Sequence, residues 1–227
     1  AIVNLAAFTD VDGCERDPVR AERDNATAVG HLAAAARERG ATLLHVSTDY
    51  VFDGTKGAPY DERDAPAPLS VYGRTKLAGE EHARTVDAHL VVRTGFLFGV
   101  GTDHCSRAVA RMRAGEDAGG LVDRIGSPTY VPDLAARLAS LLEARVRGTY
   151  HLAGPEPTSW FDVLVRARRI GDLVGAPVAQ RAEDLGLVAP RPAASALTSV
   201  RLAAAGIEPL PPLDDALARF LQVPPSP

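Results

Sequence analysis

Short apolar runs alternate with longer amphipathic segments through most of the chain. The strand-like runs lie at residues 1–7, 41–47, 89–94, 120–123 and 149–153. The helix-like segments lie at 19–39, 70–86, 106–114, 133–144 and from residue 159 onward, with Gly40 as a C-cap and Ser70 as an N-cap. Strands separated by helices of this length pair in parallel through crossover connections. The pattern therefore predicts an α/β fold, a doubly wound parallel sheet of the Rossmann-like kind.

The chain changes character from about residue 177. Prolines cluster there, with only short helical pieces between them, at Pro190, Pro192, Pro209, Pro211 and Pro212. We therefore expect a Rossmann-like core over residues 1–176, with substrate-binding elements interleaved in it. A small C-terminal substrate-binding lobe over residues 177–227 is expected to pack on the sheet.

Composition and charge exclude several classes of protein. The chain has 227 residues, of which 46% are hydrophobic and 24% charged, and its net charge is −4. Without a basic cluster there is no indication of nucleic-acid binding, and no apolar run reaches the roughly 18–20 residues of a membrane span. The two cysteines favour a reducing cytoplasm, and the six scattered histidines predict no metal site.

A Tyr and a Lys four residues apart are the first candidate chemistry. Tyr72 and Lys76 lie on the predicted helix that Ser70 caps, and that spacing puts both side chains on one helix face. A neighbouring ammonium stabilises a phenolate and lowers its pKa, which makes a tyrosine a usable proton donor near neutral pH. A half-buried Tyr and a solvated Lys would show the same spacing, so the pair alone leaves both interpretations open.

Polar residues at the ends of two predicted strands strengthen the case. The second strand turns polar at Ser47-Thr48-Asp49, and ligands of open parallel sheets bind beyond the carboxyl ends of strands. Ser, Thr and Asp are also turn signals, but Gly54, Gly57 and Pro59 keep a helix from following directly. At the end of the first strand, the small residues Ala6 and Ala7 suit either a flat ligand or close helix packing.

Three motifs now occur together in order: Asn4 to Asp12, Ser47 to Gly54, and Tyr72-Gly73-Arg74-Thr75-Lys76. In this combination the chain resembles the dTDP-4-dehydrorhamnose reductase family of the extended short-chain dehydrogenase/reductases. The similarity continues through Gly126-Ser127-Pro128-Thr129, Tyr150 to Gly154 and Arg191 to Leu197. It covers nearly the whole chain.

The resemblance implies an NAD(P)H-dependent oxidoreductase that reduces the 4-keto group of a nucleotide-activated 6-deoxyhexose. NADPH or NADH would be the cofactor and a dTDP-linked 4-keto-6-deoxy sugar the small-molecule partner, in deoxysugar biosynthesis, and a homodimer is compatible with it. It implies catalytic roles for Tyr72 as proton donor, for Lys76 and for Thr48.

The resemblance also implies binding residues. Those for the cofactor are Ala6, Ala7 and Thr9 together with Tyr72 and Lys76, and those for the substrate are Thr48, Asp49, Tyr50, Phe96 and Arg191. Asn25 matches a position that supports the active-site lysine through water. Arg191 suits a substrate phosphate, although it would equally cover the C-terminal lobe.

The chain departs from the family pattern in two places. Phe96 stands where the family often has a Trp, and a Phe packs on a sugar but has no indole N–H to donate. The glycine-rich turn that cradles a cofactor pyrophosphate is not found. The chain begins at what resembles the fourth strand of the family, so roughly 60 residues of a doubly wound fold are missing from it. We expect it to be a fragment of a complete reductase.

Two other functions remain open at this point. One is a nucleotide-sugar epimerase or dehydratase of the same superfamily, although a dehydratase usually has an Asp-Glu pair after the strand-end Thr and this chain has Asp49-Tyr50. The other is a non-catalytic dinucleotide-binding regulatory subunit, which fold alone does not exclude. Two residues have structural interpretations only: Trp160 is expected to anchor a helix to the core, and Cys105 to be a packed thiol.

Overall fold

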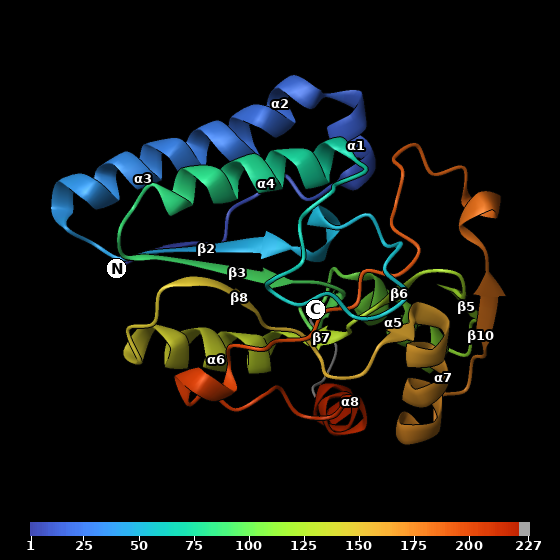
Figure 1. The fold of residues 1–227 in the computed structure, drawn as a ribbon. Coiled ribbons are helices and arrows are strands. Elements are labelled where there is room, and N and C mark those ends of the chain that lie inside the picture. The colour runs from blue at the N-terminus through green and yellow to red at the C-terminus, as the bar shows by residue number, and fades with distance from the viewer. Residues whose placement is uncertain (223–227) are drawn as a thin grey trace.

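The computed structural model describes residues 1–222, and its centre is a four-stranded parallel sheet (Figure 1). The strand order is β1 (Ile2–Asn4), β2 (Leu43–Thr48), β3 (His89–Thr94) and β8 (Gly148–His151). Since all of these strands are parallel, their carboxyl ends meet at one edge of the sheet, where Thr48 pairs with Thr94. The predicted α/β fold with a parallel sheet is confirmed.

Helices cover both faces of this sheet (Figure 1). On one face, α3 (Ala28–Arg39) and α4 (Val71–Arg84) pack on Leu43. On the other face, α6 (Val131–Glu143) packs on Leu44. Successive side chains of a strand point to opposite faces, so a strand covered on both sides reads as a continuous apolar run.

The predicted helix over residues 19–39 is one helical stretch with an irregular turn inside it. It consists of α2 (Pro18–Glu22), a π-helical turn η1 (Arg23–Thr27) and α3, and it ends at Gly40 with a left-handed backbone at φ 58°. The helical extent was predicted correctly, and the π turn was not predicted. Before it lies α1 (Val11–Arg16), a short helix that the sequence pattern did not indicate.

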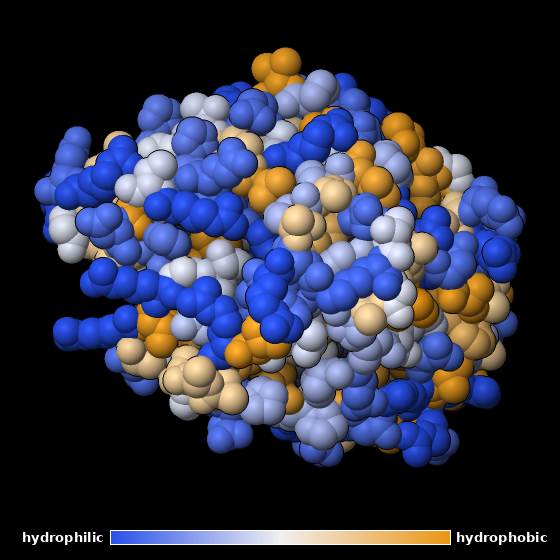
Figure 2. Space-filling view, viewed as in Figure 1, coloured by the Kyte–Doolittle hydropathy of each residue, from blue (hydrophilic) through white to orange (hydrophobic). Residues whose placement is uncertain are grey.

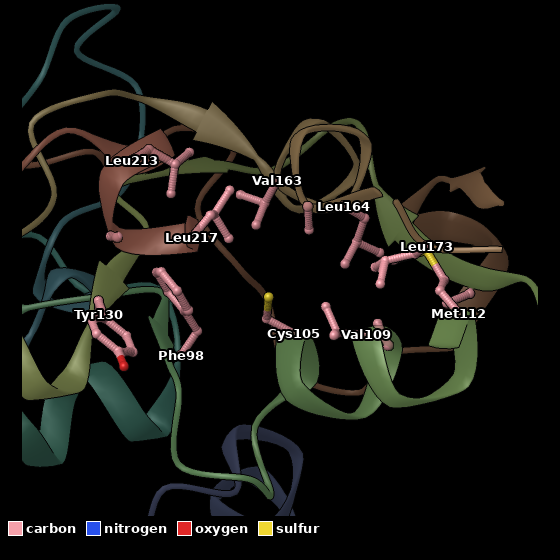
Figure 3. Packing of buried hydrophobic residues seen from close by; sticks show 14 residues of the cluster. Phe98, Cys105, Val109, Met112, Tyr130, Val163, Leu164, Leu173, Leu213 and Leu217 are labelled. Atoms are coloured by element: carbon pink, nitrogen blue, oxygen red, sulfur yellow. The ribbon is translucent and has the colours of Figure 1, made fainter. Parts of the chain in front are cut away.

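A second apolar core lies beside the sheet and joins distant parts of the chain (Figure 3). It is formed by α5 (His104–Arg113), α7 (Trp160–Gly171) and α8 (Leu213–Gln222), which pack around Phe98. Cys105 is fully buried in this core, and burial raises the pKa of its thiol. The expectation of a packed thiol is confirmed.

Short strand pairs and 3-10 turns make up further parts of the fold. The strand pairs are β5 (Ala118–Leu121) with β10 (Pro177–Gln180), β4 (Leu97–Phe98) with β7 (Thr129–Tyr130), and β6 (Ile125–Gly126) with β9 (Thr158–Ser159). The 3-10 turns are η2 (Asp49–Val51), η3 (Ala182–Leu185) and η4 (Ala203–Ala205). Isolated bridges also join Tyr60 to Leu197 and Ile125 to Ala194. The division of the chain at residue 176 stays a prediction.

The first strand differs from its prediction. A buried strand was expected over residues 1–7, but β1 ends at Asn4, and Val3 and Leu5 are 46% and 65% exposed. The reason is position: among the described residues β1 pairs only with β2, at the edge of the sheet. On the face shown in Figure 2, polar and apolar side chains are interspersed. Within residues 1–222, no helix has the length and apolar character needed to cross a membrane.

Candidate active site

A cavity of about 470 Å³ opens at the carboxyl ends of β2 and β3. It brings together eight of the ten predicted site residues: Ala7, Thr9, Thr48, Asp49, Tyr50, Tyr72, Lys76 and Phe96. The other two, Ala6 and Arg191, do not line it. Eight further residues, which sequence reasoning did not assign to a site, also line it: Leu5, Val11, Val46, Ser47, Thr94, Gly95, Leu97 and Trp160.

The helix α4 positions Tyr72 and Lys76. Ser70 caps its start, since its Oγ accepts a hydrogen bond from the N–H of Gly73 at 3.1 Å. Lys76 is 3% exposed, and its Nζ donates to the backbone oxygen of Val46 on β2 at 2.7 Å. That bond uses one of three ammonium N–H donors and leaves donor capacity for a ligand in the cavity.

The pKa of Tyr72 shifts in the opposite direction from the one expected. Burial raises it first, hydrogen bonding with Thr48 lowers it, and the charge of Asp49 raises it further. Lys76 is not among the largest causes of this shift, and burial outweighs the groups that lower the pKa. The hydroxyl of Tyr72 is therefore protonated at neutral pH, as a proton donor must be at the start of a reaction.

Thr48 serves both as a turn residue and as part of the cavity wall. Its Oγ1 accepts the N–H of Tyr50 at 3.2 Å and so caps the 3-10 turn η2. The same hydroxyl donates to Oδ1 of Asp49 at 3.1 Å. Thr94, its partner in register, has a buried hydroxyl without a partner among the described residues. A polar residue at the end of the neighbouring strand was the signal that could have identified Thr94.

Asp49 is a buried carboxyl held by a residue far away in the sequence. Ser195 Oγ donates to its Oδ2 at 2.5 Å, and Thr48 donates to its Oδ1. Burial raises the pKa of Asp49 to about 6, and these two hydrogen bonds work against that shift. Sequence reasoning missed Ser195, because nothing in its local pattern indicates a contact with a strand end.

Arg191 lies behind the cavity wall. Its Nη1 donates to Oδ1 of Asp12 on α1 and to the backbone oxygen of Ala189, at 2.9 and 3.0 Å. Burial raises the pKa of Tyr50 to about 12, and the guanidinium of Arg191 opposes that shift. Arg191 is thus placed between α1 and Tyr50. One interpretation of the sequence gave Arg191 a substrate phosphate as its partner, and the other had it cover the C-terminal lobe. Neither predicted the contact with Asp12.

The wall of the cavity also contains two stacked aromatic rings. Phe96 and Trp160 lie with centroids 5.0 Å apart and ring planes 4° apart. Phe96 has φ 47°, a left-handed backbone conformation that a bulky residue rarely adopts and that is often found at functional sites. A Cβ on Gly126 would lie 2.3 Å from the Phe96 ring, so only glycine fits there without displacing the ring. We call Thr48, Tyr72 and Lys76 the polar side, and Phe96 and Trp160 the aromatic side.

Trp160 had been expected only to anchor its helix. It does pack against the second core, which confirms that expectation, but it also lines the cavity. Sequence reasoning noted that Phe96 lacks the indole of a Trp, yet an indole stacks on Phe96 from α7. No pattern near residue 160 marks this contact.

Two predicted residues lie just outside the cavity wall. The N–H of Ala6 donates to Oδ1 of Asn4 at 3.2 Å. Asn25, in the π turn, exchanges hydrogen bonds with the backbone of Phe8 at 2.8 and 3.1 Å, and its Nδ2 donates to Oγ1 of Thr75 at 3.2 Å. Asn25 therefore connects the segment after β1 to the residue before Lys76. A role for Asn25 through water stays a prediction.

The cavity has the chemistry needed to hold the end of a nicotinamide cofactor. Its lining includes the small side chains of Ala7 and Thr9, the buried ammonium of Lys76 and the buried hydroxyl of Tyr72. A flat ring and a ribose hydroxyl suit such a surface. Among the described residues, no group of three His, Cys, Asp or Glu side chains is placed to hold a metal ion.

Known proteins resemble the chain over nearly its full length. A family model described as "RmlD substrate binding domain" matches residues 1–224. A protein of Mycobacterium tuberculosis named dTDP-4-dehydrorhamnose reductase is 42% identical over 236 residues, which cover 98% of this chain and 76% of that protein. A Streptomyces griseus protein of the same name is 40% identical over 92% of this chain and 72% of its own length.

Solved structures agree with this similarity. The crystal structure of dTDP-4-dehydrorhamnose reductase from Bacillus anthracis in complex with NADP superposes with a TM-score of 0.92 at 32% identity. The match covers 96% of this chain and 79% of that one.

Proposed function

Because the chain belongs to the dTDP-4-dehydrorhamnose reductase family, we propose that it reduces the 4-keto group of a dTDP-linked 6-deoxyhexose with NADPH or NADH. This is an NAD(P)H-dependent oxidoreductase step in deoxysugar biosynthesis. The observation that carries the proposal is that Thr48, Tyr72 and Lys76 line one cavity at the carboxyl ends of parallel strands.

The proton-handling steps follow from the polar side of the cavity. Bound cofactor supplies the hydride. Tyr72, whose raised pKa keeps it protonated, donates its hydroxyl proton to the carbonyl oxygen that becomes the C4 hydroxyl. Thr48 holds the same oxygen with its hydroxyl, and the Lys76 ammonium stabilises the phenolate left on Tyr72 and binds a ribose hydroxyl.

The remaining site residues have binding roles in this proposal. Ala6, Ala7 and Thr9 form the surface against which the cofactor lies. Asp49 and Tyr50 contact sugar hydroxyls, and Phe96 packs on the apolar face of the sugar.

Three further parts of the proposal concern the phosphate of the nucleotide, the cellular location and the oligomeric state. Arg191 reaches a phosphate of the nucleotide from its position beside Tyr50. A cytoplasmic location is supported by the two free, buried cysteines. A homodimer is the assembly we propose, on the family resemblance alone.

The test is an absorbance assay of cofactor consumption. Adding a dTDP-4-keto-6-deoxy sugar to the protein with NADPH should lower absorbance at the nicotinamide band. Tyr72→Phe should reduce turnover by a factor of roughly 100 or more, while the affinity for NADPH is retained. Tyr130→Phe, the same change in the second core, is the matched control and should keep wild-type turnover.

Other outcomes of the assay point to the alternatives. Tightly bound cofactor that is recycled without net consumption would indicate an epimerase or dehydratase. Cofactor binding with no sugar conversion would indicate a regulatory subunit. Full activity of Tyr72→Phe would contradict the assignment of the proton donor.

A further inference from the structure

A fully buried carboxylate lies directly behind the polar side of the cavity. Glu80 has no exposed surface, and its Oε1 accepts hydrogen bonds from Ser47 Oγ at 2.5 Å and from Arg93 Nε at 2.9 Å. Its Oε2 accepts from Arg93 Nη2 at 2.7 Å and from Arg84 Nη2 at 2.6 Å. A buried charge cluster costs desolvation energy that a set of apolar side chains would not cost. Its presence here suggests a purpose other than stability.

The position of Glu80 on α4 suggests that purpose. Tyr72, Lys76 and Glu80 follow one another at intervals of four residues, so they share one face of the helix. Tyr72 and Lys76 line the cavity, and Glu80 lies one turn further along the same face.

Two hydrogen bonds tie this helix face to the end of β2. Lys76 Nζ binds the backbone oxygen of Val46, and Glu80 binds the hydroxyl of Ser47, the next residue. Thr48, which directly follows, is the strand residue on the polar side. The two bonds therefore set where Thr48 lies relative to the hydroxyl of Tyr72.

The carboxylate of Glu80 also favours the ammonium form of Lys76. Burial lowers the pKa of Lys76 to about 8, and the carboxylate of Glu80 raises it. His45 faces both groups from β2, but burial lowers its pKa to about 3, so it is uncharged at neutral pH. Asn4 on β1 binds His45 at 3.0 Å and carries no charge.

The cations around Glu80 complete the set of charged neighbours. Arg84 faces it from α4 and Arg93 from β3, and Arg93 lies 3.4 Å from Nε2 of His151 on β8. Burial lowers the pKa of His151, so this ring is also neutral. The network thus fixes a carboxylate beside Lys76 and supports it from three strands and one helix.

We propose that Glu80 is a positioning residue of this site. Its carboxylate keeps Lys76 in the ammonium form and holds the end of β2 against α4, so that Thr48 and Tyr72 face the same ligand atom. The effect of the Glu80 carboxylate on the pKa of Lys76 does not depend on the reaction, whereas its effect on turnover rests on the function proposed above.

The two roles of Glu80 are separated by two variants. Glu80→Gln removes the charge and keeps an oxygen that accepts the hydrogen bond of Ser47. Ser47→Ala removes that bond and keeps the charge. If the single Glu80 variant does not fold, the double variant Glu80→Gln/Arg93→Gln removes both buried charges together, and the guanidinium that remains, on Arg84, is 34% exposed.

The charge effect is measurable because the chain has only two lysines, Lys56 and Lys76. Carbon-13 lysine labelling gives two Cε resonances, and Lys56→Arg assigns them. In an NMR titration, the pKa of Lys76 should fall by about one unit in Glu80→Gln or in the double variant. It should stay unchanged in Ser47→Ala. An unchanged Lys76 titration in the variants without Glu80 would overturn the proposal.

Steady-state kinetics then tests the link to the reaction. In Glu80→Gln the alkaline limb of the kcat/KM profile should move to lower pH by the shift seen in the titration. In Ser47→Ala, kcat should fall at every pH without a move of that limb. A shifted Lys76 pKa in a protein that never reduces the sugar would refute the proposed function and leave the role of Glu80 intact. Normal reduction with an unshifted pKa would refute the role of Glu80 alone.

Discussion

The polar side and the aromatic side of the cavity face the same volume but are built in different ways. On the polar side, Thr48, Tyr72 and Lys76 lie near one another in the sequence, on one strand and the helix after it. Hydrogen bonds to backbone atoms hold Thr48 and Lys76. On the aromatic side, Phe96 and Trp160 come from distant segments and are held by stacking and by the space that Gly126 leaves.

This difference suggests a division of labour. Groups that move a proton must be placed to within a fraction of an ångström, and hydrogen bonds within the sheet and its helix give that accuracy. A surface that packs on a sugar needs only shape and apolar area. We therefore expect changes on the polar side to lower kcat and changes on the aromatic side to raise KM.

The largest effect is expected for Lys76→Met, which removes the ammonium and keeps much of the apolar side-chain volume. Turnover should fall by a factor of roughly 100 or more, because the Tyr72 phenolate loses its counter-charge. Lys56→Met is the matched control, since Lys56 pairs with Asp64 on the surface. Steady-state kinetics measures both. A wild-type kcat in Lys76→Met would contradict the expectation that changes on the polar side lower kcat.

A smaller effect is expected for Gly126→Ala, whose methyl would enter the space of the Phe96 ring. The displaced ring should lose its stack on Trp160, and KM for the sugar nucleotide should rise by about tenfold with kcat nearly kept. Gly30→Ala adds a methyl at 3.4 Å from the His82 ring, far from the cavity, and serves as the control. Equal effects of the two changes would contradict the role of the aromatic side.

Trp160→Leu tests the aromatic side with a smaller expected effect on KM. Loss of the stacking on Phe96 should cost about 1 kcal/mol of binding, or about a fivefold rise in KM. Phe161→Leu, one residue along α7 and outside the cavity wall, is the control. The kinetic constants should show a change in KM alone, and a dominant fall in kcat would place Trp160 with the polar side instead.

The smallest effect concerns Asp49, which also lines the cavity. Its pKa of about 6 means that it takes up a proton as pH falls through 6 and can then no longer accept from both Thr48 and Ser195. The kcat/KM profile should therefore fall a few-fold below pH 6 in the wild type. Asp49→Asn should remove this limb between pH 5 and 8. A limb that persists in the variant would assign the titration to another group.

The sequence predicted the polar side because its signals are local. The spacing of Tyr72 and Lys76 on one helix and the polar end of β2 are visible within a few residues. Most strands and helices were predicted for the same reason, since the two-residue and 3.6-residue periods are local patterns. The first strand was predicted too long, because its apolar run continues to residue 7 although the strand ends at Asn4.

The rest of the site depends on contacts between distant segments. Ser195 meets Asp49, Trp160 meets Phe96, and Arg191 meets Asp12 only after the chain has folded. Their residue types suit many surroundings, so no local pattern distinguishes them. The direction of the Tyr72 pKa shift was wrong for a related reason: burial, which spacing does not reveal, is the largest cause of that shift.

The π turn between α2 and α3 constrains how many residues this part of the chain can contain. An α-helix turns by about 100° per residue, and a π turn accommodates one residue more than an α turn. Deleting one residue from 23–27 would therefore rotate the side chains on one flank of the turn away from their partners. Asn25 would lose Phe8 or Thr75 while the helix itself stayed intact. Relatives with a shorter helix here would need another way to connect the segment after β1 to α4.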